Sequence, residues 1–187
     1  MKNKKIIAII GMAGSGKTAT VEYLIKKYSW PKIYLGEATF DRLKKDGVAV
    51  NYTNEKIIRE NIRQELGMGA YAKLALPKVA KLLKTAKIVL IESLYSWDEY
   101  KIFKKKYGEN FLAIAITTPS KIRLHRLKIR SIRPIKNAAE LTKRDWTEIE
   151  GTDKGGPIAV ADHTIINDGS TKKLRKNIDL IIKKIIG

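Results

Sequence analysis

The chain has 187 residues, 44% of them hydrophobic, and its 38 lysines and arginines against 19 acidic residues give a formal net charge of +19 at pH 7. It contains no cysteine, which excludes a disulfide framework and a thiolate metal site and favours an intracellular protein. Its apolar runs fall short of the roughly 20 residues that a membrane span requires, so we expect a cytoplasmic protein folded as one domain over residues 1–187.

The positive charge fits a nucleic-acid partner, an anionic surface or a lysine-rich solvated exterior. The lysines are spread over every expected helix instead of forming one stripe, which favours the solvated exterior. The sequence shows neither a helix-turn-helix pattern nor an aromatic-rich RNA-binding signature. A nucleic-acid partner is therefore disfavoured, but the net charge keeps it open.

Short apolar runs alternate with longer helical patterns along the chain. In order, the patterns predict strands at 4–10, 32–36, 87–92, 111–117 and 163–167, and helices at 16–28, 38–46, 54–66, 70–84, 96–107, 119–130, 138–149 and 170–185. Ser96 and Glu99 have the spacing of a capping box at the start of one of these helices. The order predicts an α/β fold, with βαβ units around a mostly parallel sheet that has helices on both faces.

The first expected strand leads directly into Gly11–Thr18, "GMAGSGKT". This stretch satisfies the P-loop pattern, in which glycines let backbone N–H groups turn inward around phosphate oxygens at the start of a helix. Lys17 is expected to reach the β and γ phosphates, and the Thr18 hydroxyl is expected to bind Mg²⁺. The sequence therefore predicts ATP and Mg²⁺ as cofactors.

Glu92 ends the third expected strand and would bring a carboxylate to the edge of the sheet. Ligands of open α/β sheets bind beyond the carboxyl ends of the strands, so Glu92 would lie near the metal and the transferred phosphate. It could bind Mg²⁺, directly or through water, or accept the proton of an acceptor hydroxyl. The alternative is a strand-end residue that faces solvent.

Glu37 stands just after the second expected strand, next to Gly36. It could orient or deprotonate an acceptor, or it could be a first-turn acid that the helix dipole favours. The sequence leaves open whether Glu37 or Glu92 is the base.

A cluster of arginines lies at 123, 126, 130 and 133. The first three are spaced by three and four residues and so share one helix face. Arginine's fixed fork of donors can stabilise the charge that spreads over a phosphoryl group during transfer. The alternative for this cluster is a solvated basic face.

Two further stretches carry a resemblance to the nucleoside-monophosphate-kinase-like branch of the P-loop kinases, which includes dephospho-CoA kinase and uncharacterised adenylate-kinase-related prokaryotic proteins. Arg126–Arg130, "RLKIR", looks like the segment that leads into the lid of dephospho-CoA kinases, where arginines meet the phosphates. Ala161–Ser170, "ADHTIINDGS", looks like their last strand and the turn that closes around adenine. Gly36-Glu37-Ala38 departs from the aspartates of those kinases and fits the adenylate-kinase-related proteins better. In that family a helix ending in a glutamine follows the lid, and in Asn137–Glu150 the residues Arg144 and Glu148 stand where that glutamine would be sought.

The resemblance implies a P-loop NTPase fold with three α/β/α layers and a five-stranded parallel sheet. It also implies a helical acceptor-binding insert near 37–84 and a small lid near 130–155. The implied reaction is transfer of the γ-phosphate of ATP to a small phosphorylated acceptor, first a nucleoside monophosphate and second dephospho-CoA. A nucleic-acid-binding or regulatory P-loop ATPase is the alternative of another class. The protein would be a monomer or a homodimer.

The expected site has three groups of residues. Those expected to hold ATP are Gly11, Met12, Ala13, Gly14, Ser15, Gly16, Lys17, Thr18, Thr20, Arg130, Asn167 and Gly169. Those expected to act in catalysis are Lys17, Glu37, Glu92, Arg126, Arg130 and Arg133. Those expected to bind the metal are Thr18 and Glu92.

Overall fold

The computed structural model describes residues 4–131 and 134–187, apart from the side chain of Tyr52. Its elements are β1 (Lys5–Ile10), α1 (Lys17–Tyr28), β2 (Lys32–Tyr34), α2 (Glu37–Lys45), α3 (Tyr52–Leu66), α4 (Ala70–Leu82), β3 (Ile88–Glu92), α5 (Trp97–Tyr107), the 3-10 turn η1 (Gly108–Asn110), β4 (Phe111–Thr117), α6 (Ser120–Lys128), α7 (Ala138–Thr152), α8 (Gly155–Ala159), β5 (His163–Ile166) and α9 (Thr171–Ile186). The five expected strands and eight expected helices are all present, and the short helix α8 and the turn η1 are additions.

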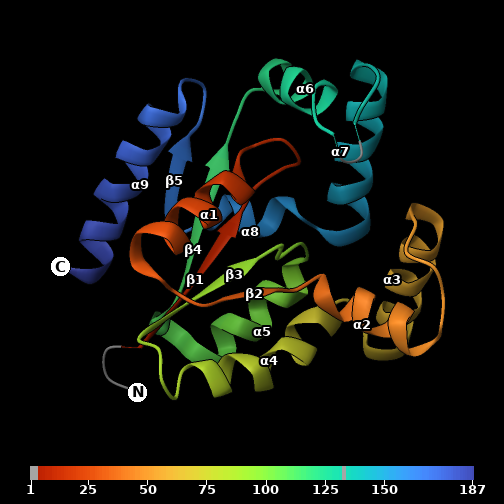
Figure 1. The fold of residues 1–187 in the computed structure, drawn as a ribbon, viewed down its shortest axis with the longest axis horizontal. Helices are drawn as coiled ribbons and strands as arrows, with labels where there is room; N and C mark the ends of the chain where they lie inside the picture. The colour runs from red at the N-terminus through yellow and green to blue at the C-terminus, as the bar shows by residue number, and fades with distance from the viewer. Residues whose placement is uncertain (1–3, 132–133) are drawn as a thin grey trace.

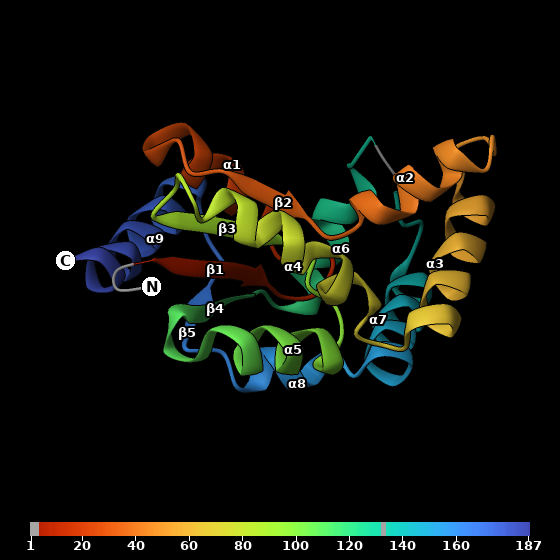
Figure 2. The same cartoon turned by 90° about the horizontal axis from the view of Figure 1, so that it is seen from below.

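The five strands form one parallel sheet in the order β2-β3-β1-β4-β5. Because all strands run the same way, their carboxyl ends lie at one edge of the sheet. Figures 1 and 2 show the helix pairs α2–α3 and α6–α7 beyond this edge. The predicted α/β fold with a five-stranded parallel sheet is therefore confirmed, and the sheet edge is where segments distant in sequence converge.

Strand residues alternate between two apolar layers, which is why the runs in the sequence are continuous. On one face, Ile7 and Ile9 of β1 pack with Val21 of α1 and Ile182 of α9. On the other face, Ile6, Ala8 and Ile10 belong to a larger core formed with α2, α3, α4 and α5. A third, small cluster joins the P-loop to α6 and α7 and consists of Ala13, Leu127, Ile135 and Leu141.

Within the described ranges, no helix combines the length and the apolar character that crossing a bilayer would require. This agrees with the reading of the sequence, in which the apolar runs are the short strands of the sheet.

Candidate functional site

The P-loop connects β1 to α1 through three glycines with positive φ angles, at 139° for Gly11, 78° for Gly14 and 105° for Gly16. Other residues rarely adopt these angles, and a Cβ atom on Gly11 would lie only 2.3 Å from the carbonyl oxygen of Ile116. Lys17 begins α1, and its Nζ donates to the Met12 carbonyl at 2.9 Å. The lysine is thereby folded over the loop, and this placement is compatible with the expected contact to phosphates.

Two residues that directly follow β4 and β5 bind the backbone of the P-loop. The Asn167 side-chain amide donates to the Ser15 carbonyl at 2.7 Å, and the Thr118 hydroxyl lies within bonding distance of the Ser15 and Asn167 carbonyls, at 3.1 and 3.0 Å. Asn167 is only 5% exposed, and its backbone N–H donates to the Thr117 carbonyl. The polar groups of Asn167 are thus engaged in fixing the loop, whereas Gly169 lies exposed in the turn that follows.

Thr18 and Glu92 meet at the carboxyl edge of the sheet. The Thr18 hydroxyl donates to Glu92 Oε1 at 3.2 Å, and Lys32 Nζ, from β2, donates to Glu92 Oε2 at 2.8 Å. Glu92 is only 7% exposed, so it does not face solvent as a bare strand end would. A hydroxyl and a carboxylate are oxygen ligands of the kind that Mg²⁺ binds, so this pair fits the metal that ATP carries.

Thr20 lies one turn into α1 and is fully buried. Its hydroxyl donates to the Gly16 carbonyl at 3.0 Å. Its side chain is therefore directed at the backbone of the loop, and it supports the loop's conformation.

The arginine cluster divides into separate roles. Arg123 is buried, binds both carboxylate oxygens of Asp145 at 2.9 and 2.6 Å, and donates to the Ala13 carbonyl at 3.2 Å. Arg126 donates through Nη2 to the Asn167 carbonyl at 3.2 Å, and its buried Nη1 has no hydrogen-bond partner among the described residues. Arg130 is half-buried just beyond α6, and the expected lid residue Arg133 lies outside the described residues.

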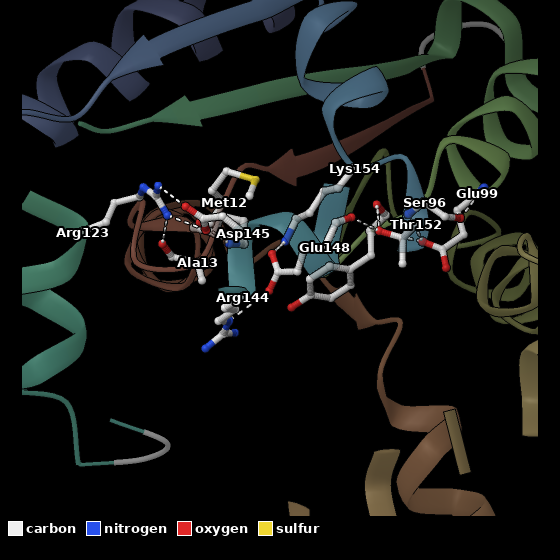
Figure 3. Close-up of polar contacts among 12 residues, drawn as sticks. Met12, Ala13, Ser96, Glu99, Arg123, Arg144, Asp145, Glu148, Thr152 and Lys154 are labelled. Atoms are coloured by element: carbon white, nitrogen blue, oxygen red, sulfur yellow. Dashed lines mark hydrogen bonds and ion pairs between the residues drawn. The ribbon is translucent and has the colours of Figure 1, made fainter. Parts of the chain in front are cut away.

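Helix α7 brings a charged cluster to the P-loop that the sequence did not single out as a unit. Lys154 Nζ donates to Glu148 Oε2, and Arg144 Nε donates to Glu148 Oε1 at 3.0 Å. Figure 3 shows Glu148 between these two cations and, as a separate group, Arg123 bound to Asp145 and Ala13. Lys154 sits in a stretch without apolar periodicity and looks like the many surface lysines, so no sequence signal marks it.

The pKa of Lys17 is lowered to about 7. Burial is the main cause, since it disfavours the ammonium form, and the charges of Lys154 and Arg144 lower it further. The carboxylates of Glu148 and Glu92 act in the opposite direction. The charges of α7, the junction before α8 and β3 therefore all act on the P-loop lysine.

A cavity of about 400 Å³ opens between the end of β2 and helices α2, α3 and α4. Tyr34, on its wall, is paired in the sheet with Glu92, so the cavity begins at the same edge as the Thr18–Glu92 pair. Its other walls include Leu35, Ala38, Asp41, Tyr71 and Leu74. A volume of this size lies within the range of small-molecule sites.

Glu37 lines this cavity as the first residue of α2. Its carboxylate accepts a hydrogen bond from Lys78 Nζ of α4 at 2.7 Å, and its side chain is 52% exposed. The structure thus brings Thr18 and Glu92 together at the P-loop and places Glu37 on the cavity wall beside Lys78.

Glu99 completes the capping box predicted for Ser96, and it is buried in the first turn of α5. Its Oε2 accepts hydrogen bonds from the backbone N–H groups of Tyr95 and Ser96 at 2.8 and 3.1 Å. Burial raises the pKa of Glu99 to about 7, although these two N–H groups oppose the rise. Between its ordinary pKa of 4.5 and 7 the folded protein keeps a proton that the unfolded chain has released. This group's contribution to the free energy of unfolding therefore falls as the pH rises through that window.

Glu99→Gln should raise the free energy of unfolding at pH 8 by about 2 kcal/mol, because an amide can accept the same N–H groups without a buried charge. Near pH 4.5, where Glu99 is protonated in the folded protein, the variant and the wild type should be nearly equal. Urea unfolding at both pH values measures the difference, with the exposed Glu109→Gln as control. An identical gain at the two pH values would contradict the titration of Glu99.

Curated relatives cover nearly the whole chain. A UPF0200 protein of Thermococcus gammatolerans is 36% identical over 183 residues, which span 97% of this chain and 95% of the relative. A UPF0200 protein of Sulfurisphaera tokodaii is 32% identical over 185 residues, spanning 97% of this chain and 98% of the relative. No protein-family model matches the chain.

Solved structures with the same fold include several kinases. Shikimate kinase from Bacteroides thetaiotaomicron superposes with a TM-score of 0.61 at 14% identity, covering 97% of this chain and 98% of that one. A gluconokinase from Sinorhizobium meliloti superposes with a TM-score of 0.54 at 13% identity, covering 99% and 97%. At these identities the likeness is one of fold, and the fold is that of the P-loop kinases.

Proposed function

Since the chain belongs to the UPF0200 family, whose name states no activity, we propose from its own site that it is an ATP-dependent kinase of a small phosphorylated acceptor, with a nucleoside monophosphate as the first candidate. The observation that carries the proposal is the cavity of about 400 Å³ that begins at the same sheet edge as the Thr18–Glu92 pair. Phosphoryl transfer requires a phosphate donor site and an acceptor site next to each other.

The donor half of the proposal rests on the P-loop and its neighbours. The positive φ angles of its glycines and the folded-back Lys17 suit a phosphate chain, and the start of α1 adds its positive dipole end. Thr18 and Glu92 would hold Mg²⁺, which would neutralise charge on the phosphates as they react. The adenine would lie near Gly169, in the exposed turn after β5.

The acceptor half rests on the segment 37–84, which would act as the acceptor-binding insert. Its cavity has an apolar wall that includes Leu35, Ala38 and Leu74, which suits the flat face of a base. Charged groups, among them Glu37 and Lys78, stand on the same walls and could orient a sugar hydroxyl or a phosphate. Within this proposal Glu37 remains a candidate base alongside Glu92, and the segment 130–155 would close over the reacting groups as a lid and exclude water.

Incubation with ATP, Mg²⁺ and a panel of nucleoside monophosphates and dephospho-CoA, followed by mass spectrometry, tests the proposal. We expect one acceptor to gain a phosphate while ADP accumulates. Dephospho-CoA belongs in the panel because "RLKIR" resembles the corresponding stretch of dephospho-CoA kinases. ATP hydrolysis without phosphorylation of any acceptor would favour the regulatory ATPase instead.

Leu74→Trp should block the acceptor without disturbing the donor. Leu74 is 41% exposed on the cavity wall, so the larger ring can project into the cavity without disrupting the core. Acceptor phosphorylation should fall by about a hundredfold, as expected when binding contacts and orientation are lost, while ATP affinity stays within about twofold. Ile57→Trp, on exposed α3 surface, is the matched control. Equal activity of the two variants would place the acceptor elsewhere.

A further inference from the structure

Among the lysines in the described ranges, Lys154 stands apart because it is only 2% exposed. An ammonium group loses its hydration on burial, so it is found inside a protein only where charged or polar groups replace the water. Here Glu148 accepts its hydrogen bond, and the ring of Tyr95 lies 4.0 Å from Nζ. Burial lowers the pKa of Lys154, and the charge and hydrogen bond of Glu148 oppose this by favouring the ammonium form.

The corner that carries Lys154 is fixed to the segment that follows β3. Asp153 ends α7 with a left-handed φ of 52°, which turns the chain back. The Thr152 hydroxyl donates to the Tyr95 carbonyl at 3.3 Å, and a Cβ atom on Gly156 would lie 3.0 Å from the Trp97 ring. These contacts fix the position of Lys154 relative to the stretch just beyond Glu92, and Figure 3 shows part of this arrangement.

Glu148 is shared between two cations, one on each carboxylate oxygen. Oε2 accepts from Lys154, and Oε1 accepts from Arg144 Nε. In the described part of the chain, the two terminal nitrogens of Arg144 have no hydrogen-bond partner, and the side chain is 32% exposed. An arginine held through Nε keeps its outer pair of donors for an incoming anion, and that fork matches a phosphate.

We propose that Lys154 is a positioning residue for the terminal phosphate of the nucleotide, acting through Glu148 on Arg144. Arginine and carboxylate readily form a two-pronged pair, in which Glu148 Oε2 would accept from a terminal nitrogen of Arg144. By occupying Oε2, Lys154 leaves Glu148 one oxygen for Arg144, so the outer donors stay available to the phosphates on the P-loop. The inference rests on the proposed function, since it requires a nucleotide on that loop.

The electrostatics of the P-loop lysine agree with this placement. Lys154, Glu148 and Arg144 all appear among the charges that shift the pKa of Lys17. Lys17 is expected to contact the β and γ phosphates, so these three charged groups would lie toward that end of the nucleotide. Arg144 should therefore distinguish ATP from ADP.

Affinities for Mg²⁺-AMP-PNP and Mg²⁺-ADP, measured by calorimetry, test the inference. Arg144→Ala and Lys154→Met should each weaken AMP-PNP binding about tenfold, the effect of one lost charge-assisted hydrogen bond, and ADP binding by less than about threefold. The double variant should lose no more than Arg144→Ala alone, because both changes remove the same contact. Lys143→Met, an exposed lysine of the same helix, should leave both affinities unchanged.

A second set of variants distinguishes a positioning role of Lys154 from a purely structural one. Without Lys154, the freed Glu148 oxygen should capture Arg144, so adding Glu148→Gln to Lys154→Met should restore part of the AMP-PNP affinity. A purely structural lysine would lower the melting temperature and leave the ratio of AMP-PNP to ADP affinity as in the wild type, which would overturn the proposal.

Two outcomes do not depend on whether Lys154→Met folds. Unchanged AMP-PNP affinity in Arg144→Ala, whose half-exposed side chain can be removed safely, would also overturn it. Failure of the wild type to bind AMP-PNP would instead reject the nucleotide site itself, so the two failures are distinguishable.

Discussion

Lys17→Met should lower phosphate transfer from ATP by about a thousandfold, the lower range for a cation that stabilises the transferring phosphoryl group. Methionine has nearly the length of lysine, and Lys17 lies at the start of α1 on a loop that Asn167, Thr118 and Arg123 hold through its backbone. The loop should therefore keep its conformation. The measurement is the turnover of the acceptor found in the panel, together with the melting temperature.

Lys26→Met, an exposed change on the same helix, is the control and should leave turnover unchanged. A folded Lys17→Met enzyme with wild-type turnover would reject the assignment of the P-loop as the donor site.

The lowered pKa of Lys17 predicts a pH dependence of nucleotide binding that Lys17→Met can test. With a pKa of about 7 in the free protein, Lys17 must take up a proton to bind a phosphate as an ammonium ion above pH 7. Affinity for ATP should therefore fall by about tenfold per pH unit above 7 until bound Lys17 itself titrates. The lowered pKa of Lys17 also affects the free energy of unfolding. Between pH 7 and 10.5 the unfolded chain binds more protons at Lys17 than the folded protein does, so the contribution of Lys17 to this free energy rises with pH. Lys17→Met should abolish the proton uptake.

The strands and long helices could be predicted because their signals are local. A short continuous apolar run such as Ile88–Ile91 indicates a strand that is buried on both faces, and the structure buries all four residues. Helix α8 was not predicted, since Gly155, Gly156 and Pro157 are poor helix residues. What holds this short helix is tertiary, because Gly156 lies against the ring of Trp97.

The candidate site was predictable where its residues are neighbours in sequence or where the sheet topology brings them together. The P-loop is read from eight neighbouring residues, and the meeting of Thr18 with Glu92 follows from strand ends sharing one edge. For Arg123 the spacing was misleading. It suggested a role shared with Arg126, but the side chain of Arg123 is buried and paired with Asp145. The role of Lys154 could not be predicted either, because its partners lie on another helix and in the segment after β3. No local sequence pattern indicates such long-range contacts.

Glu92→Gln should lower turnover by about a hundredfold, which is within the range for losing a positioned acid or base. Glutamine has the same shape, and its oxygen can still accept from Thr18, so the sheet edge should remain intact. Lys32 would lose its ion partner, but its side chain is 36% exposed and water can replace the carboxylate. The loss therefore falls on chemistry and not on folding.

The dependence on Mg²⁺ then identifies which role Glu92 has. If the carboxylate binds the metal, the variant should need about tenfold more Mg²⁺ and recover much of its turnover at saturation, because charge on a ligand sets metal affinity. If Glu92 is the base, saturating Mg²⁺ should not help, and the acidic limb of the pH–rate profile should disappear. Wild-type turnover at every Mg²⁺ concentration would exclude both roles and leave Glu37, beside Lys78 on the cavity wall, as the remaining candidate base.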